Sequence, residues 1–483
     1  MNLLDDFFQQ SRKTPERIAL TQEQRRLSYA ELARKAKQIA ASLLGRNAAG
    51  QCLAIAQGRG IDAVTTVFGI LAAGGSYLPL DCRNPANRPQ QIVSDARPKY
   101  IIGSGPCPDW LVTPEQWLDV QQLQNSQPAQ HLPAIEPEAI AAILYTSGSS
   151  GMPKGVALSH RAMHNFSRWA AENFNVGPDD RIASLSPLHF DLSVFDLFSG
   201  LSQGASVHFI PDRLTMAPSR LTAWLDEKAI SIWYTVPSLL SFIALKGALT
   251  TTPLPDLRSI LFAGEVFPTA HLITLAGQLP HVRLHNLYGP TETTVCCWWP
   301  VDRSRLRADA PIPIGHPACG AELKIQAETG ELLAKGANNF SGYWQQGGLQ
   351  NPRTANAWYP TGDRVSRNQY GEYCYHGRLD RMLKCSGYRV EPAEIETVIE
   401  QCPGVLRCAV TGLTDTTSGQ RPAAAVVLEA GADLAIISAV LRTKLPAYMY
   451  PCRVLALEKL PLLSNGKIDY QILKKLLTNH TGT

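Results

Sequence analysis

The segment from Leu144 to His160, LYTSGSSGMPKGVALSH, is the feature that most constrains how this chain folds. The apolar run that leads into it, residues 141–145, predicts a buried strand. Residues 146–155 then combine hydroxyl side chains, glycines and Lys154. Glycines let backbone N–H groups turn toward an anion, while hydroxyls add donors and lysine adds charge. This combination predicts a loop that holds a polyphosphate.

The same loop differs from a Walker A loop in two respects. Gly155 follows Lys154 where a Walker A loop has Ser or Thr, and the next residues, GVALSH, predict a strand rather than a helix. A flexible Gly/Ser linker would have a similar composition. The loop alone therefore leaves a phosphate site and a linker as alternatives.

The composition of the chain sets its broad class. A length of 483 residues exceeds one ordinary hydrophobic core, so we expect at least two domains. The apolar content of 45% is typical of a globular protein, and a net charge of +4 without basic runs gives no indication of a nucleic-acid partner. The acidic N-terminal segment and the lack of a membrane-length apolar run predict a cytoplasmic protein without a membrane partner.

The cysteines are scattered along the chain. There are eleven of them with no CxxC pair, which favours reduced thiols. We expect the adjacent Cys296 and Cys297 to be buried packing residues rather than a redox site.

Helical and strand-like patterns alternate along most of the chain. Ser28 and Glu31 form a capping box ahead of a helix. One face of this helix is apolar and consists of Leu32, Ala36, Ile39 and Leu43. Up to about residue 300, apolar strands alternate with helices, which is the pattern of an α/β protein. The stretch 105–137 contains Pro, Asp and Glu and predicts a surface connection.

The pattern changes after residue 390. A helix that begins at Glu391-Pro392, strands over 404–413 and 423–430, and a helix over 433–445 together predict a small α+β unit.

The boundary of this unit is placed in the polar stretch 377–381. The sequence thus predicts a large α/β domain with several sheets over residues 1–379 and a small α+β domain over residues 380–483.

Several other short segments follow the phosphate loop in a fixed order. They are NLYGPTETT (286–294), YPTGD (359–363), GRLD (377–380), KCSGYRVE (384–391) and LSNGKID (463–469). Together with the loop, they resemble the adenylate-forming superfamily, and specifically the amino-acid adenylation domains of nonribosomal peptide synthesis. The likeness extends over residues 15–475. The ordered set favours the phosphate site over the flexible linker.

The resemblance implies that the enzyme uses ATP to form an acyl-adenylate. A carboxylate attacks the α-phosphorus of ATP and pyrophosphate leaves, which requires a phosphate cradle, a metal and a positive charge. The family motifs imply that the nucleotide contacts Thr146, Ser147, Gly148, Ser149, Ser150, Gly151, Lys154, Gly264, Asn286, Tyr288, Gly289, Thr291, Asp363 and Arg378.

Individual roles follow from the same resemblance. Glu292 would hold Mg²⁺, and a carboxylate is a ligand that this hard cation prefers. Tyr288 would stack on adenine, Asn286 would bind its amine, and Asp363, with Arg378 nearby, would accept the ribose hydroxyls.

Three residues near the C-terminus complete the implied mechanism. Lys467 would bridge the substrate carboxylate and the transferring phosphate. Asp380 would be the hinge about which a mobile small domain rotates between two half-reactions. Gly387 would then line the tunnel for a pantetheine thiol.

The flanking motifs also place a substrate pocket. Its predicted lining is Asp191, Leu192, Phe195, Tyr234, Leu261, Ala263, Leu287, Val295 and Cys296, together with Lys467. Asp191 is the only acid in this set, and a buried carboxylate needs a partner, which the α-ammonium of an amino acid would provide. The other walls carry no charge, so charged amino acids are disfavoured. The pattern predicts a compact apolar amino acid.

This pocket is similar to that of freestanding enzymes that activate L-proline. The resemblance implies a separate phosphopantetheinylated peptidyl carrier protein as acceptor and a product used for pyrrole units, as in prodigiosin and pyoluteorin biosynthesis. We expect a freestanding enzyme, because no Gly-Gly-x-Ser carrier segment follows residue 469. Another small apolar amino acid, an acyl-CoA ligase activity and a non-catalytic binding protein remain alternatives.

Overall fold

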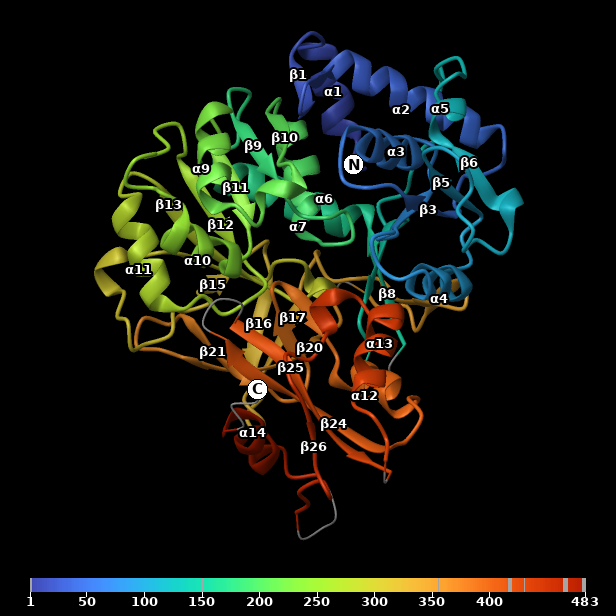
Figure 1. The fold of residues 1–483 in the computed structure, drawn as a ribbon. Coiled ribbons are helices and arrows are strands. Elements are labelled where there is room, and N and C mark those ends of the chain that lie inside the picture. Colours follow the sequence, from blue (N-terminus) through green and yellow to red (C-terminus); the bar gives the residue numbers. More distant parts are fainter. Residues whose placement is uncertain are drawn as a thin grey trace.

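The computed structural model describes residues 2–148, 152–354, 356–415, 419–429, 431–463 and 468–479. It confirms the predicted α/β fold with two large sheets, a smaller antiparallel sheet and a small α+β unit at the C-terminal end (Figure 1). No helix in these ranges is both long enough and apolar enough to cross a membrane.

The first large sheet has the strand order β15-β14-β13-β12-β11-β9-β10-β1-β2. In chain order, these strands are β1 (Ile18–Gln22), β2 (Arg25–Ser28), β9 (Arg181–Ser184), β10 (Ser206–Phe209), β11 (Ile232–Thr235), β12 (Ser259–Phe262), β13 (Arg283–Tyr288), β14 (Cys297–Pro300) and β15 (His316–Pro317). The strands from β1 to β13 in this order pair in parallel. Because parallel strands end at one edge, β11, β12 and β13 deliver the residues that follow them to the same place.

The second large sheet contains the phosphate-loop strands. Its order is β19-β18-β8-β7-β4-β3-β5-β6. The strands are β3 (Cys52–Ala56), β4 (Ser76–Pro79), β5 (Tyr100–Gly103), β6 (Trp117–Asp119), β7 (Ile140–Thr146), β8 (Lys154–Ser159), β18 (Gly342–Gln345) and β19 (Gly348–Gln350). Strands β7 and β8 are antiparallel, with Thr146 opposite Lys154. Both strands predicted around the loop are therefore confirmed.

The prediction that residues 105–137 form only a surface connection was wrong in part. This stretch contains β6, which extends the sheet beside β5, and the short helix α5 (Val120–Leu123), whose Val120 and Leu123 are buried. The ring of Trp117 lies directly over Gly103, where a Cβ atom would meet it at 1.9 Å. The edge strand thus depends on a contact that local sequence does not reveal.

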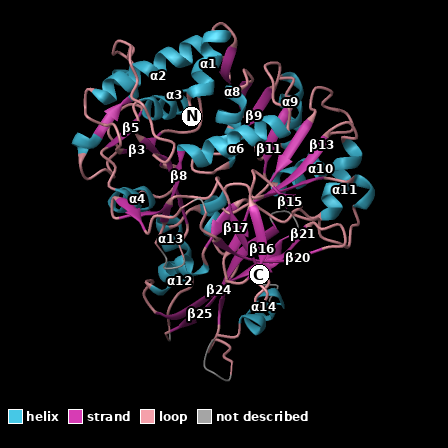
Figure 2. Ribbon diagram, turned by 180° about the vertical axis from the view of Figure 1, so that it is seen from behind, coloured by secondary structure: helices cyan, strands magenta, loops and turns pink. Residues whose placement is uncertain are grey.

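The helices cover both large sheets (Figures 1 and 2). They are α1 (Asp5–Lys13), α2 (Tyr29–Leu44), α3 (Ile61–Ala72), α4 (Asn87–Ala96), α6 (His160–Asn173), α9 (Pro218–Glu227), α10 (Pro237–Lys246) and α11 (Thr269–Gln278). The predicted capping box is confirmed, because Ser28 Oγ accepts from the Glu31 N–H and the Glu31 carboxylate accepts from the Ser28 N–H.

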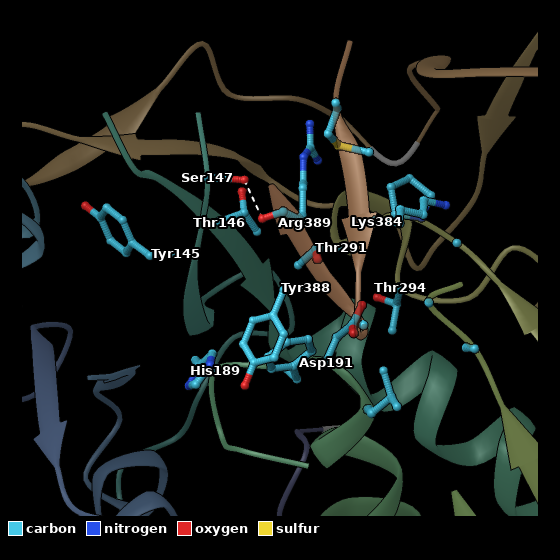
Figure 3. A pocket seen from close by; sticks show the side chains of 18 of the residues that line it. Tyr145, Thr146, Ser147, His189, Asp191, Thr291, Thr294, Lys384, Tyr388 and Arg389 are labelled. Atoms are coloured by element: carbon cyan, nitrogen blue, oxygen red, sulfur yellow. Dashed lines mark hydrogen bonds between the residues drawn. The ribbon is translucent and has the colours of Figure 1, made fainter. Parts of the chain in front are cut away.

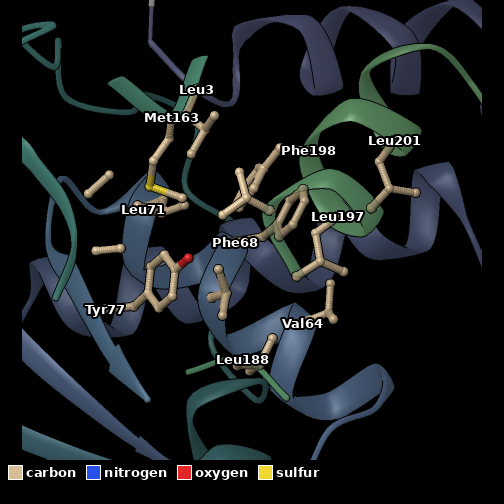
Figure 4. Packing of buried hydrophobic residues seen from close by; sticks show 14 of the residues in the cluster. Leu3, Val64, Phe68, Leu71, Tyr77, Met163, Leu188, Leu197, Phe198 and Leu201 are labelled. Atoms are coloured by element: carbon tan, nitrogen blue, oxygen red, sulfur yellow. The ribbon is translucent and has the colours of Figure 1, made fainter. Parts of the chain in front are cut away.

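The main core lies between the two large sheets around α3. Almost the whole of α3 is buried, and its Phe68 stacks on Phe198 with ring centroids 5.5 Å apart (Figure 4). Met163 of α6 and Leu71 of α3 belong to the same apolar cluster. This core fixes the two sheets relative to each other and thereby the loops at their edges.

A four-stranded antiparallel sheet follows. It consists of β16 (Glu322–Ile325), β17 (Glu331–Lys335), β20 (Tyr359–Arg367) and β21 (Tyr373–Arg378). In its register Asp363 of β20 faces Arg378 of β21. The sheet therefore brings together two residues that are separated along the sequence.

The C-terminal unit has its own sheet and helices. These are β22 (Leu383–Cys385), β23 (Tyr388–Val390), α12 (Pro392–Glu400), β24 (Val405–Asp415), β25 (Gly419–Leu428), α13 (Ala435–Lys444), β26 (Val454–Ala456) and α14 (Tyr470–Asn479). The strands and helices predicted here are confirmed, and two buried apolar clusters lie within residues 383–477. The division at residues 379 and 380 and the mobility of the unit stay predictions.

Candidate active site

A pocket lies where the edges of the two large sheets meet the β22–β23 hairpin (Figure 3). The end of β7 contributes Thr146 and Ser147, and the segment before the short helix α7 (Leu192–Val194) contributes Asp191. Residues after β12 and β13 form another wall, and Tyr388 and Arg389 come from β23. The lining thus includes the segments that carry the sequence motifs.

The phosphate loop leaves polar groups ready for a ligand. The hydroxyl of Thr146 is buried and has no hydrogen-bond partner among the described residues. Ser147 Oγ donates to the carbonyl oxygen of Arg389 at 2.6 Å. At Gly148 a Cβ atom would lie 2.0 Å from the carbonyl oxygen of Met152, so only glycine fits there. The predicted contacts Ser149, Ser150 and Gly151 lie outside the described residues.

Glu292 pairs with two cationic side chains of the site. It sits on a 3₁₀ turn (Thr291–Thr293) with its side chain fully buried. Its carboxylate lies 3.2 Å from Arg389 and 3.5 Å from Lys154 and accepts from the Tyr343 hydroxyl at 3.0 Å. Burial alone would raise its pKa, but the charges of Arg389 and Lys154 outweigh burial and lower the pKa of Glu292 to about 2. The group is therefore a carboxylate at neutral pH.

The predicted nucleoside contacts lie on the first large sheet and the small antiparallel sheet. Asp363 is buried and accepts from the Tyr288 hydroxyl and from Arg378 at 2.9 Å. Asn286 donates its amide nitrogen to the Pro313 carbonyl at 2.8 Å, which leaves the amide oxygen as an acceptor. A narrow cavity beside the main pocket is lined by Asn286, Tyr288, Gly264, Gly289 and Tyr375, among others.

Two glycines meet where the C-terminal unit contacts the first sheet. Gly264 and Gly387 both have positive φ angles, +95° and +82°. A Cβ atom at Gly264 would lie 3.8 Å from Gly387 Cα, and one at Gly387 would lie 2.8 Å from Val236 Cγ1. The hairpin can approach this closely because neither residue carries a side chain.

Asp191 is a carboxylate without a side-chain partner among the described residues. It lines the pocket, and its apolar surroundings raise its pKa to about 7. Leu192, Tyr234, Ala263 and Val295 line the same pocket. This arrangement places one carboxylate without a described side-chain partner beside four uncharged side chains, in a pocket whose other walls carry Arg88, Lys384 and Arg389.

The remaining predicted pocket residues lie farther back. Phe195 is buried behind the wall, where its ring packs edge to face on the ring of Tyr234 with centroids 5.7 Å apart. Leu261 is buried on β12. Leu287 lines the neighbouring narrow cavity, and Cys296 belongs to a cluster beyond β13. The burial expected for Cys296 and Cys297 is confirmed. Lys467 lies outside the described residues, so its role stays a prediction.

Sequence reasoning assigned no role to several residues that meet at this site. Tyr343 is one of them, and Arg389 is another; Arg389 occurs inside the motif KCSGYRVE (384–391), which was the available signal for it. Arg88 of α4, which lines the pocket, forms a buried ion pair with Glu394 of α12. These two residues are 306 positions apart, and nothing in the local sequence indicates their contact.

Two family models match the chain. One, described as AMP-binding enzyme, matches residues 7–344, and the other, the AMP-binding enzyme C-terminal domain, matches residues 394–467. The chain therefore belongs to the AMP-binding enzymes, an adenylate-forming, ATP-using family.

Two curated relatives resemble the chain over almost its whole length. Both are named L-proline--[L-prolyl-carrier protein] ligase. The one from Streptomyces coelicolor is 36% identical and the match covers 92% of this chain and 91% of the relative. The one from Pseudomonas fluorescens is 34% identical and the match covers 94% and 95%. Among solved structures, o-succinylbenzoate CoA synthetase from Bacillus subtilis shares the fold, with a TM-score of 0.86, 22% identity and 98% coverage of both chains.

The buried pair between Arg88 and Glu394 should hold the C-terminal unit in the described arrangement. Arg88→Ala leaves the Glu394 carboxylate buried without its partner, which typically costs about 3–5 kcal/mol. We expect faster amide hydrogen exchange over residues 385–390 in this variant. Arg97→Ala, which removes an exposed arginine at the end of α4, is the matched control. Equal exchange in the two variants would contradict this role of the pair.

Proposed function

We propose that this enzyme activates L-proline with ATP and transfers the prolyl group to the phosphopantetheine thiol of a separate peptidyl carrier protein. The observation that carries the proposal is Asp191, a carboxylate that lines the pocket beside Leu192, Ala263 and Val295 and has no side-chain partner among the described residues. The two relatives that match the chain over nine-tenths of its length are proline ligases of this kind.

Proline recognition follows from the chemistry of the pocket. The protonated imino nitrogen of proline would pair with Asp191, which otherwise has no side-chain partner among the described residues. Leu192, Ala263 and Val295 offer apolar surface to the ring. Asp191 and Lys467 are the charged residues of the predicted substrate set, and both would bind the backbone groups of the amino acid. A charged substrate side chain would therefore lose its hydration without compensation.

In the first half-reaction, a carboxylate oxygen of proline forms a bond to the α-phosphorus of ATP and the bond to pyrophosphate breaks. The loop residues Thr146 and Lys154 would bind the leaving phosphates, and Asp363 would hold the ribose. Lys467, by its family motif, would stabilise the charge that develops on the transferring phosphate.

Magnesium fits this site as an ion shared with the nucleotide. No group of three His, Cys, Asp or Glu residues able to hold a metal is found in the described ranges. Mg²⁺ typically binds one or two carboxylates together with substrate phosphates, and Glu292 supplies one buried, ionised carboxylate beside the phosphate loop. When bound, the ion would neutralise charge on the phosphates.

In the second half-reaction, the carrier thiol attacks the prolyl carbonyl and AMP leaves. The described arrangement suits this step, because Arg389 already pairs with Glu292 and binds Ser147. Arg389 therefore contacts both Glu292, the proposed metal ligand, and Ser147 of the phosphate loop. Because these two groups would bind the metal and the phosphates in the first step, the hairpin would dock here after pyrophosphate has left. The prolyl thioester would then supply a pyrrole unit, as in prodigiosin-type products.

Amino-acid-dependent exchange of pyrophosphate into ATP tests the proposal. L-Proline should be the best substrate in a panel of amino acids and aryl acids. Asp191→Ala should reduce proline-dependent exchange by at least about 100-fold, because a buried ion-pair partner is worth ~3–5 kcal/mol. Asp179→Ala, which removes an exposed acid, is the control. Faster exchange with valine, alanine or an aryl acid would refute the proline assignment.

The raised pKa of Asp191 predicts how activation depends on pH. Below about pH 7 the empty pocket holds a protonated carboxyl, which cannot pair with the ammonium of proline. The kcat/KM for proline should therefore fall about tenfold for each pH unit below this pKa. The KM for ATP, measured over the same range, serves as the control. A kcat/KM for proline that stays constant through this range would contradict the prediction.

The hinge role proposed for Asp380 can be tested by fixing its φ angle. Asp380→Pro should slow thioester formation far more than pyrophosphate exchange, because rotation of the small unit is needed between the steps. Asp380 also pairs with Arg378. Asp380→Ala removes that pair without fixing φ and is the matched control. Equal losses in both half-reactions of the proline variant would argue against a hinge here.

A further inference from the structure

The hydroxyl of Tyr343 lies between two charged side chains of the phosphate site. It donates to the Glu292 carboxylate at 3.0 Å and accepts from the Lys154 ammonium at 3.2 Å. The Tyr359 hydroxyl also donates to it. A hydroxyl has one hydrogen to donate and two lone pairs, so every position of this group is used. The roles proposed for Glu292 and Lys154 do not account for a hydroxyl placed between them.

The ring of Tyr343 makes a second contact with the lysine. The Lys154 ammonium lies 4.5 Å from the centre of the ring, which is within the range of a cation–π interaction. The same ammonium lies 3.5 Å from a carboxylate oxygen of Glu292. The side chain of Tyr343 therefore offers this ammonium two contacts that are alternatives to the carboxylate.

Tyr343 is held in place by packing and by backbone contacts. It lies on β18, which pairs with β8. The indole of the next residue, Trp344, donates to the Ala96 carbonyl at the end of α4 at 3.1 Å. Phe340 packs on the Tyr343 ring with centroids 4.9 Å apart, and its N–H donates to the main-chain carbonyl of Glu292 at 2.8 Å. The hydroxyl is thus fixed relative to the turn that carries the carboxylate.

The functions proposed for the two charged groups conflict if the groups pair with each other. Glu292 is proposed to bind Mg²⁺, and Lys154 is proposed to bind the phosphates that leave. An ammonium bound directly to the carboxylate would compete with the metal, because both cations need the same oxygens. The observed separation of 3.5 Å is longer than the roughly 2.8 Å of a charge-assisted hydrogen bond, so the direct pair is loose.

We propose that Tyr343 is a positioning residue that keeps the Lys154 ammonium from closing onto the Glu292 carboxylate, so that the carboxylate can bind Mg²⁺ while the ammonium binds phosphate. The inference rests on the proposed function, which needs both groups in the first half-reaction. The hydroxyl donates to the carboxylate and accepts from the ammonium, and thereby replaces a direct ion pair. Without it, the ammonium would move onto the carboxylate and weaken the metal site.

Binding of α,β-methylene-ATP, which cannot release pyrophosphate, tests this role without turnover. Calorimetry gives its dissociation constant with and without Mg²⁺, and the ratio of the two values measures the contribution of the metal. Tyr343→Phe keeps the ring and removes the hydroxyl. We expect this variant to lower the ratio about tenfold, as the loss of one charge-assisted contact would. The Mg²⁺ concentration for half-maximal pyrophosphate exchange should rise by a similar factor, while the KM for proline stays unchanged.

Tyr359→Phe is the matched control. It removes a neighbouring phenolic hydroxyl that donates to Tyr343. This variant should keep the ratio of the wild type. Lys154→Ala supplies a second comparison, because Tyr343→Phe should not lower the ratio further once no ammonium remains to be held away.

An unchanged ratio in Tyr343→Phe would overturn the proposal, and so would an equal loss of affinity with and without Mg²⁺. A further fall of the ratio when Tyr343→Phe is added to Lys154→Ala would also overturn it, because the hydroxyl would then act on the metal site without the lysine. These outcomes concern nucleotide binding alone. Failure of the wild type to exchange pyrophosphate in response to proline would instead refute the proposed function.

Discussion

The arrangement of the active site depends on the ion pairs and the hydrogen bond that the buried carboxylate of Glu292 forms. Lys154 of β8, Tyr343 of β18 and Arg389 of β23 all converge on it. Burying a carboxylate without a partner costs several kcal/mol of folding free energy. The contacts with these three segments therefore stabilise the buried Glu292. The phosphate loop, the edge of the second sheet and the hairpin of the C-terminal unit are thus held around a single charge.

This constraint links the substrate pocket to the acceptor side of the site. Arg389 pairs with Glu292, and its neighbour Tyr388 packs on Phe190, next to Asp191. Gly387, one residue earlier, approaches Gly264 at the edge of the first sheet. A hairpin of a few residues therefore contacts the phosphate loop, the substrate wall and the proposed path of the thiol together, so the predicted movement of the small unit would change all three contacts at once.

The sequence predicted those features of the fold and the site that depend on neighbouring residues in the chain. Alternation and capping patterns placed the strands around the phosphate loop and the helix after Ser28, and the ordered motifs indicated the family. Three-dimensional contacts could not be read in this way. The Arg88–Glu394 pair joins residues that are distant in the sequence. The edge strand at Trp117 depends on Gly103, whose missing side chain leaves room for the Trp117 ring. The depth of Phe195, Leu261 and Cys296 behind the pocket wall likewise depends on how sheets pack, which motif spacing does not specify.

The proposed enzyme selects proline and delivers it to a carrier. The most direct measurement incubates the enzyme with ATP, Mg²⁺, holo-carrier, coenzyme A and an equimolar mixture of amino acids, and determines the masses that the carrier and coenzyme A gain. We expect a carrier that gains the mass of one prolyl group, and hydroxylamine should remove this group as a hydroxamate because it is held as a thioester. A carrier loaded with a different amino acid, or efficient formation of prolyl-coenzyme A with an unloaded carrier, would contradict this expectation.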